Sequence, residues 1–340
     1  MTSAVSSSVP RAQKTWTYPP LIRAQTLLIA LALLGFLLAT GRDVEVGRMV
    51  RMTGEAIWAT AGGKVDSQVA RGLGRIGPSL FPLQISERQE ISRIEGFDRA
   101  HLPWLSHLEV VETPIQVLNP DTLRMESRPE RVEYLVKPLG YLGHVAVKLW
   151  ETLEIALWGT VLAILLSAPL AFFSAANLTP SRIAYVAARG TVSFLRAIPE
   201  LVSALFLVLA YGFGPIAGVL ALALHAAGFL GKFYAEDIEN ADPKPQEALV
   251  AIGANRLKVL RFAILPQVLP QYIAYTLYVL DRNFRMATVI GLVGAGGIGQ
   301  ELKGRFDMYN YHHVGTILAG IFLAVFVIDQ FAARLRRRFL

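Results

Sequence analysis

Six apolar stretches alternate with polar connections along this chain. They are Leu21–Thr40, Leu149–Ala176, Ile183–Tyr211, Pro215–Phe233, Val268–Ile290 and Val314–Ile328. A helix rises 1.5 Å per residue, so about 20 apolar residues cross the roughly 30 Å hydrocarbon core of a bilayer. The pattern therefore predicts an all-α membrane protein with six transmembrane helices, the first over residues 21–40.

The composition changes abruptly between Gly41 and Gly140. This stretch carries 13 Lys/Arg and 14 Asp/Glu residues, whereas the remainder of the chain carries 20 and 12. A long, balanced segment can be translocated while basic segments stay in the cytoplasm. We therefore expect an extracytoplasmic insert over residues 41–147, between the first and second spans. A cleavable signal peptide is the alternative interpretation of the first apolar stretch, because a basic segment precedes it.

Within the insert, two patterns predict local structure. Residues 44–76 fit amphipathic helix, and residues 110–136 alternate as short strands do, around a turn at Asn119-Pro120-Asp121. Neither pattern points to a chemical activity.

Basic residues at the ends of the apolar stretches predict the topology. Residues 1–20 form a basic tail, Arg182 and Arg189 mark one inside end, and the C-terminus carries Arg334, Arg336, Arg337 and Arg338. These charges place both termini in the cytoplasm of a multi-pass protein of the cell membrane, with the other five spans in a core over residues 148–340. They are not gathered on one face, which disfavours nucleic acid as a partner.

The composition also limits the chemistry. Hydrophobic residues make up 53% of the chain and charged residues 17%, and there is no cysteine. Disulfides, thiolate metal sites and iron–sulfur clusters are therefore excluded, and no histidine set has zinc-ligand spacing. There is no GxxxxGK[ST] motif, so if the protein moves a solute uphill, the energy must come from another subunit or an ion gradient.

A polar, basic segment at 247–270 lies between two apolar stretches. We expect a helix from about Gln246 until Pro266 stops it, with Ala248, Leu249 and Ile252 along one side and Arg256 and Lys258 in water. The charge pattern puts this segment, and the loop over residues 240–266 that contains most of it, in the cytoplasm. An ordinary surface helix is the plain alternative.

A glycine-rich sequence, VGAGGIG, follows the fifth apolar stretch. Gly294, Gly296 and Gly299 have the spacing of a dinucleotide-binding loop, but such a loop needs a βαβ unit around it. Here it lies between membrane spans. We interpret it, with Gly297, as a close-packed break in a helix and a candidate gate, because irregular backbone at this depth must be covered by protein or line a cavity.

Charged and polar residues interrupt two of the apolar stretches. Asp281, Arg282, Asn283 and Arg285 lie in one, and Arg196 and Glu200 lie in another. Charges at bilayer depth cost a few kcal/mol, so they should face the bundle interior, a partner or water. Arg196 and Glu200, four residues apart, could pair on one helix face. Either these charges hold helices together, or Arg285 and Arg196 supply positive potential along the route of an anion.

The polar segment resembles the EAA loop of permease subunits in binding-protein-dependent ABC importers, on Glu247-Ala248-Leu249, Gly253 and Leu265-Pro266. The resemblance implies the type I, methionine-permease-like architecture and a loop that docks in a cleft of an ATPase subunit. No cofactor is then expected in this chain, because ATP and Mg are bound by the partner. The coupling residues implied are Glu247, Ala248, Gly253, Arg256, Leu265 and Pro266.

Four further runs, RAIPELVSALF, YGFGPIAGVLAL, GFLGKFYAEDIEN and RNFRMATVIGLVGAGGIG, are similar to permeases for phosphonate and phosphite. The resemblance implies a non-catalytic transport subunit that forms a homodimer, pairs with two ATPase subunits and receives a phosphorus oxyanion from an extracytoplasmic binding protein. The residues expected to form its translocation pathway or gate are Arg196, Glu200, Asn283, Arg285, Gly294, Gly296, Gly297 and Gly299.

Other functions remain open at this point. Related permeases for methionine and quaternary amines share the EAA loop and a glycine-rich loop. An ion-gradient-driven carrier or channel would work without an ATPase, and an enzyme acting on lipid phosphates would need acids or histidines clustered at bilayer depth.

Overall fold

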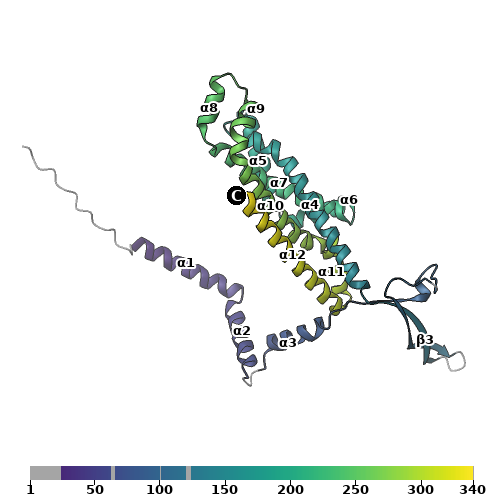
Figure 1. The fold of residues 1–340 in the computed structure, drawn as a ribbon. Coiled ribbons are helices and arrows are strands. Elements are labelled where there is room, and N and C mark those ends of the chain that lie inside the picture. The colour runs from purple at the N-terminus through teal and green to yellow at the C-terminus, as the bar shows by residue number, and fades with distance from the viewer. Residues whose placement is uncertain (1–23, 63–65, 100, 120–123, 340) are drawn as a thin grey trace, which may run out of the picture. The chain divides into compact units, whose positions relative to one another are not determined.

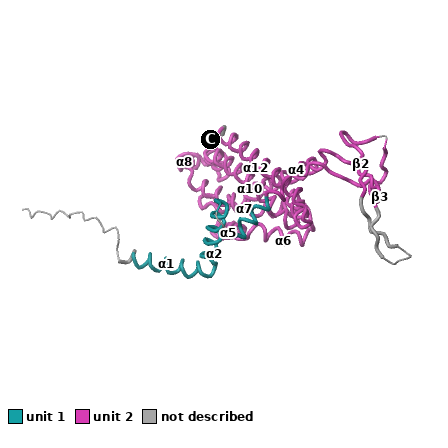
Figure 2. Tube along the Cα trace, turned by 90° about the horizontal axis from the view of Figure 1, so that it is seen from below, with its two compact units in different colours: residues 1–76 teal, residues 77–340 magenta. Residues whose placement is uncertain are grey.

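The computed structural model describes residues 24–62, 66–99, 101–119 and 124–339. Its chain divides into two compact units, residues 1–76 and residues 77–340 (Figure 2). The predicted tail over residues 1–20, the first residues of the predicted first span and the Pro120-Asp121 turn lie outside the described residues.

The described part of the first unit contains helices and short connections. Helix α1 (Ala24–Asp43) contains most of the first apolar stretch, and α2 (Val46–Thr60) follows after a bend of 68°. Glu45, at the bend, has a left-handed backbone with φ of 53°. Helix α3 (Gln68–Leu80) crosses the boundary between the units. The predicted amphipathic helix over residues 44–76 is therefore two separate helices.

The second unit begins with a three-stranded antiparallel sheet of order β1-β3-β2. The strands are β1 (Glu87–Glu90), β2 (His107–Asn119) and β3 (Arg124–Lys137). The hairpin of β2 and β3 confirms the strands predicted around Asn119, although they are long, at 13 and 14 residues. The chain is mostly helical and not all-α, because this sheet is present.

The segment between α3 and β1 is bonded to the helical bundle. The Gln84 N–H donates to the carbonyl of His312 at 3.3 Å, and the Thr316 hydroxyl donates to the carbonyl of Gln84 at 2.7 Å. The Tyr141 N–H donates to the carbonyl of Ile85 at 3.1 Å. The base of the sheet is thereby fixed to the first turns of the helices that begin at residues 140 and 311.

The bundle itself consists of long helices and several shorter ones, joined by short connections (Figure 1). In chain order these are α4 (Gly140–Ser174), α5 (Arg182–Ala197), α6 (Glu200–Tyr211), α7 (Pro215–Asn240), α8 (Pro243–Ala251), α9 (Arg256–Val259), the π-helix η2 (Leu260–Ile264), α10 (Leu265–Gly291), α11 (Gly297–Asp307) and α12 (Tyr311–Phe339).

Among the described residues, three helices are long and apolar enough to cross a membrane, namely α4, α7 and α12. The number rises to five if each of two bent pairs, α1 with α2 and α5 with α6, is one span. The apolar stretch predicted as one span over residues 183–211 is two helices, because α5 and α6 meet at 91°. Pro199 precedes α6 directly and has no N–H with which to continue the α5 ladder.

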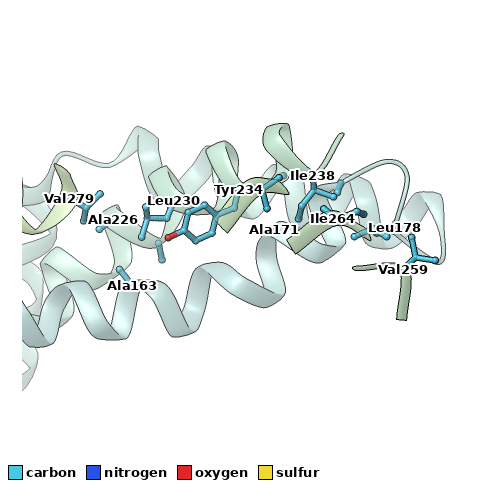
Figure 3. Packing of buried hydrophobic residues seen from close by; sticks show 14 of the residues in the cluster. Ala163, Ala171, Leu178, Ala226, Leu230, Tyr234, Ile238, Val259, Ile264 and Val279 are labelled. Atoms are coloured by element: carbon cyan, nitrogen blue, oxygen red, sulfur yellow. The ribbon is translucent and has the colours of Figure 1, made fainter. Parts of the chain in front are cut away.

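Small side chains let the central helices pack closely. Helix α7 buries a row of alanines and glycines against α4, and a Cβ added to Gly159 of α4 would lie 3.0 Å from that of Leu222. Larger side chains, among them Leu230, Tyr234 and Ile264, fill the end of the bundle nearest α8 and α9 (Figure 3). Close approach over small residues is a common way to associate helices where lipid surrounds them.

Candidate functional site

The polar segment after α7 folds as two short helices and a π-turn. The predicted single helix up to Pro266 is wrong: α8 ends at Ala251 and Pro266 lies in the first turn of α10, where its missing N–H costs nothing. Gly253 ends α8 with a left-handed φ of 83°. The N–H groups of Gly253 and Ala254 donate to the carbonyls of Val250 and Leu249, which is a Schellman motif.

The tip of this segment exposes apolar side chains. Val250, Ile252 and Leu257 are 60%, 80% and 65% exposed. The prediction that Leu249 and Ile252 share one side is wrong, because Leu249 packs on the core while Ile252 lies past the end of the helix. Exposed apolar side chains gathered at the end of a bundle are typical of an interface.

A groove of about 770 Å³ runs beside the tip. Glu247 and Arg256 line it together with Asn177 and Leu178, from the connection between α4 and α5. Arg256 also donates weakly to the carbonyl of Leu178, at 3.5 Å. The other coupling candidates lie nearby: Ala248 is exposed on α8, while Leu265 is half-buried and Pro266 exposed at the start of α10.

The base of the segment is fixed by Glu239, near the end of α7. Its carboxylate accepts two hydrogen bonds from Arg189 of α5, each at 2.9 Å, and one from the Ala176 N–H at 2.7 Å. Arg189 also donates to the carbonyl of Ser174 at 3.0 Å. These contacts join the end of α7 to the middle of α5 and to the end of α4. The sequence shows both charges, but not that they meet across 50 residues.

The glycine-rich sequence forms a tight turn between α10 and α11. Gly294, Gly296 and Gly297 have φ values of 94°, 85° and 69°. A Cβ added to Gly299 would lie 2.1 Å from the carbonyl oxygen of Thr288, and one added to Gly297 would lie 2.6 Å from the Thr152 hydroxyl. The predicted close-packed break is confirmed, and the glycines are required both by conformation and by space.

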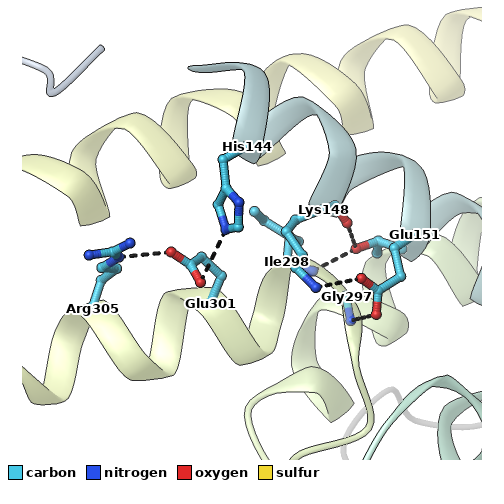
Figure 4. A network of polar contacts seen from close by, with 8 residues as sticks. His144, Lys148, Glu151, Gly297, Ile298, Glu301 and Arg305 are labelled. Atoms are coloured by element: carbon cyan, nitrogen blue, oxygen red, sulfur yellow. Dashed lines mark hydrogen bonds and ion pairs between the residues drawn. The ribbon is translucent and has the colours of Figure 1, made fainter. Parts of the chain in front are cut away.

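Helix α4 holds the start of α11 (Figure 4). The Gly297 N–H donates to the Glu151 carboxylate at 2.9 Å, and the Ile298 N–H donates to the Thr152 hydroxyl at 2.8 Å. Lys148 lies 2.7 Å from the same carboxylate. These side chains satisfy amides that have no partner within α11, and a carboxylate is favoured at a helix N-terminus. Sequence reasoning missed Glu151 and Thr152, which lie 146 residues from their partners.

Further along α11, Glu301 accepts from Arg305 at 2.8 Å and lies 3.4 Å from His144 of α4 (Figure 4). Polar contacts thus join α4 to α11 at the first residues of α11, Gly297 and Ile298, and one turn further on, at Glu301.

The charged residues of α10 are paired with carboxylates. The predicted pair of Arg196 and Glu200 is wrong, because the bend at Pro199 separates them. Glu200 instead pairs with Arg282 and lies 3.4 Å from His225. Arg285 pairs with Asp281 of its own helix at 2.5 Å.

Two more pathway candidates have different surroundings. Arg196, in the last turn of α5, is exposed, and among the described residues it has no ion pair. Asn283 is buried and donates to the Thr160 hydroxyl of α4 at 2.9 Å. The fold brings Glu200 near Arg282, which was not predicted as a pathway residue.

The polar segment over residues 240–266, the helical bundle and the glycine turn over residues 294–299 all lie in a region that matches a known family. Residues 167–340 match the family model described as the binding-protein-dependent transport system inner membrane component. The chain belongs to this family. It is therefore a non-catalytic transport component, multi-pass in the inner membrane, and its glycine turn is not part of a nucleotide-binding domain.

Curated relatives and a solved structure agree with this family. A candidate phosphite transport permease, HtxE of Stutzerimonas stutzeri, is 61% identical over 259 residues, covering 76% of this chain and 99% of the relative. The phosphite transport system permease protein PtxC of the same organism is 44% identical over 56% of this chain and 69% of its own length.

The fold is similar to a chain of the MetNI methionine ABC transporter in an inward-facing conformation, with a TM-score of 0.51 and 21% identity. The match covers 58% of this chain and 96% of that one. It confirms the expected methionine-permease-like fold.

Proposed function

We propose that this permease carries phosphite, phosphonate or a similar phosphorus oxyanion into the cytoplasm as part of an ATP-driven importer. The identity of 61% to HtxE, over nearly the whole of that relative, supports the substrate class more than any other observation. The match to PtxC agrees with it.

The protruding segment, residues 240–266, would couple the permease to an ATPase subunit. Its exposed apolar tip and the groove beside it supply a surface for docking. The ion pair of Glu239 and Arg189 would then pass the movement to α4, α5 and α7. ATP and Mg would be bound by the ATPase, and no cofactor by this chain. We further propose a homodimer with two ATPase subunits and an extracytoplasmic binding protein.

The topology with six spans belongs to the same proposal. Helices α4, α7 and α12, the bent pair of α5 with α6, and a first span within α1 would make five, and α10, at 27 residues, would be the sixth. Helix α10 is more polar than the others because it carries Asp281, Arg282 and Arg285, which would face the pathway or a partner helix. Both termini would then be cytoplasmic, the first span would cover residues 21–40, and residues 41–147 would form the extracytoplasmic insert.

The pathway would run past the charged residues of α10 and the glycine turn. Arg285 is 46% exposed at its side chain and can offer positive potential to an anion. Arg196, Glu200 and Asn283 remain candidates for the same route. The turn at residues 294–299 would act as the gate.

Two alternatives predict different results. A permease for methionine or a quaternary amine would share the fold, and a carrier driven by an ion gradient would not need the exposed tip at Ile252.

Ligand binding by the partner binding protein tests the substrate class. Titration of that protein in a calorimeter with phosphite, methylphosphonate, phosphate, methionine and glycine betaine should show tight binding of phosphite or methylphosphonate. Tight binding of methionine or glycine betaine, without either phosphorus compound, would contradict the proposal.

A further inference from the structure

An apolar cavity of about 440 Å³ lies between α4, α7 and α10. Its wall includes Ala168 of α4, Ile238 of α7, Leu260 of η2 and Leu269 of α10. Leu269 is 50% exposed and Ala168 is also exposed, so the cavity opens at the surface of the bundle. Ile238 belongs to the end of the bundle nearest α8 and α9 (Figure 3). Because spans surround the cavity in the proposed topology, its opening faces hydrocarbon.

The chemistry of the cavity wall suits an acyl chain. Of the lining residues, all of which are described, three are polar and none is charged. The hydroxyls of Tyr234 and Thr276 lie 3.0 Å apart, and the Tyr272 hydroxyl donates to the carbonyl of Tyr234 at 2.7 Å. These polar groups are therefore occupied by one another. An anion buried there would have no charged partner, which is costly, so the phosphorus oxyanion does not suit this cavity.

Two basic residues are adjacent in sequence to the cavity wall. Arg261 directly follows Leu260, and Lys258 precedes Leu260 by two residues. Both are exposed, and within the described part of the chain neither forms an ion pair. The proposed topology puts them at the cytoplasmic surface of the membrane. Basic residues in this position attract the headgroups of anionic lipids.

The size of the cavity also favours a lipid over a helix. A helix with its side chains is about 10–12 Å across, which is too wide for a cavity of this volume to take in along its length. A single acyl chain is narrow enough to enter it.

We propose that the cavity binds an acyl chain of an anionic phospholipid from the cytoplasmic leaflet, with the headgroup phosphate at Arg261 and Lys258. This inference rests on the proposed function and its topology. Both basic residues belong to the coupling segment, and Leu265 and Leu269 of the first turns of α10 pack on the chain. The lipid thereby joins the coupling segment to the start of α10.

Native mass spectrometry of the permease assembled with its ATPase tests the cavity. The complex is offered equal amounts of phosphatidylglycerol and phosphatidylcholine with identical palmitoyl and oleoyl chains. The wild type should retain phosphatidylglycerol in preference. Ala168→Phe fills the opening and should lower the amount retained about tenfold, because an added ring excludes the chain. Ala319→Phe, at an exposed position of α12 outside this cavity, is the matched control and should retain lipid as the wild type does.

A charge variant tests the headgroup contact separately. R261Q/K258Q should lose about tenfold of the preference for phosphatidylglycerol over phosphatidylcholine, because each basic residue near the surface adds to the attraction of anionic lipid. The control R182Q/K244Q removes two other exposed basic residues, from α5 and α8, and should keep the preference.

The contrary outcomes are distinct. Equal lipid retention by the wild type and Ala168→Phe would overturn the site, and so would displacement of phosphatidylglycerol by millimolar phosphite. A wild type without bound lipid, together with a disulfide-linked dimer of Leu269→Cys in this cysteine-free chain, would assign the cavity to a second copy. Each of these results leaves the proposed function standing. Absence of ATP-driven phosphite uptake by the wild-type complex would overturn the proposed function, whatever lipid is bound.

Discussion

Gly299→Ala is expected to destabilise the folded permease strongly. The added Cβ would lie 2.1 Å from the Thr288 carbonyl oxygen and 2.9 Å from the Gly291 Cα, both of which are backbone atoms of α10. Backbone cannot turn away as a side chain can. Overpacking costs about 1–3 kcal/mol and sometimes more, out of a total stability of about 5–15 kcal/mol. The yield of monodisperse protein and the unfolding temperature should both fall sharply.

Gly304→Ala is the matched control. Gly304 lies in the same helix, α11, and a Cβ there would have no heavy atom within 4 Å. Alanine is favoured over glycine inside a helix by about 1 kcal/mol, so this variant should be as stable as the wild type or slightly more stable. Equal stability of Gly299→Ala and Gly304→Ala would show that the turn is loosely packed and contradict its assignment as a close-packed break.

Gly253→Asp is expected to abolish uptake while leaving the permease folded. A Cβ at Gly253 would meet no atom within 4 Å, but the φ of 83° strains any residue with a side chain. Such strain costs about 1–3 kcal/mol, which an intact bundle can tolerate. The substitution also puts a carboxylate beside the apolar tip that would dock on the ATPase. Membrane insertion and the proposed dimer should be retained, and substrate-stimulated ATP hydrolysis should be lost.

Gly96→Asp is the control for Gly253→Asp, because it introduces the same backbone strain and the same carboxylate at another position. Gly96 has a φ of 69°, and no atom would lie within 4 Å of its added Cβ, but it belongs to the insert over residues 41–147. Its aspartate should leave ATP hydrolysis and uptake unchanged. Unimpaired uptake by Gly253→Asp would remove the coupling role from this segment.

The sequence was most informative where a single pattern, either the length of an apolar stretch or an alternation of apolar and polar residues, determines the element. Apolar length located the long helices, and the alternation over residues 110–136 located the hairpin. The ends of helices were less well predicted where a helix continues beyond its apolar stretch into charged residues. The predicted end of one span at Phe233 falls short because α7 extends to Asn240, with Lys232 and Glu236 paired one turn apart.

Proline was the main source of error. Pro266 was interpreted as the end of a helix, but a proline in the first turn begins one just as readily, and α10 begins there. Pro199 lies within a predicted span. The bend there is 91°, and its size depends on how α6 packs on α7. Local sequence does not determine that packing.

Contacts across long sequence separations could not be predicted from one sequence. Arg282 meets Glu200 across 82 residues, and the nearer Arg196 offered a simpler pairing by helical spacing. The amides of Gly297 and Ile298 likewise find Glu151 and Thr152 only after α4 and α11 are packed. The glycines themselves were recognisable, because four of them lie within residues 294–299, between two apolar stretches.

Reconstituted transport tests the proposed function most directly. The permease would be inserted in liposomes with its ATPase, and uptake of phosphite from the loaded binding protein would be measured with and without ATP. We predict uptake that requires ATP, the ATPase and the binding protein together. Phosphite uptake by the permease alone, driven by an ion gradient, would contradict the account.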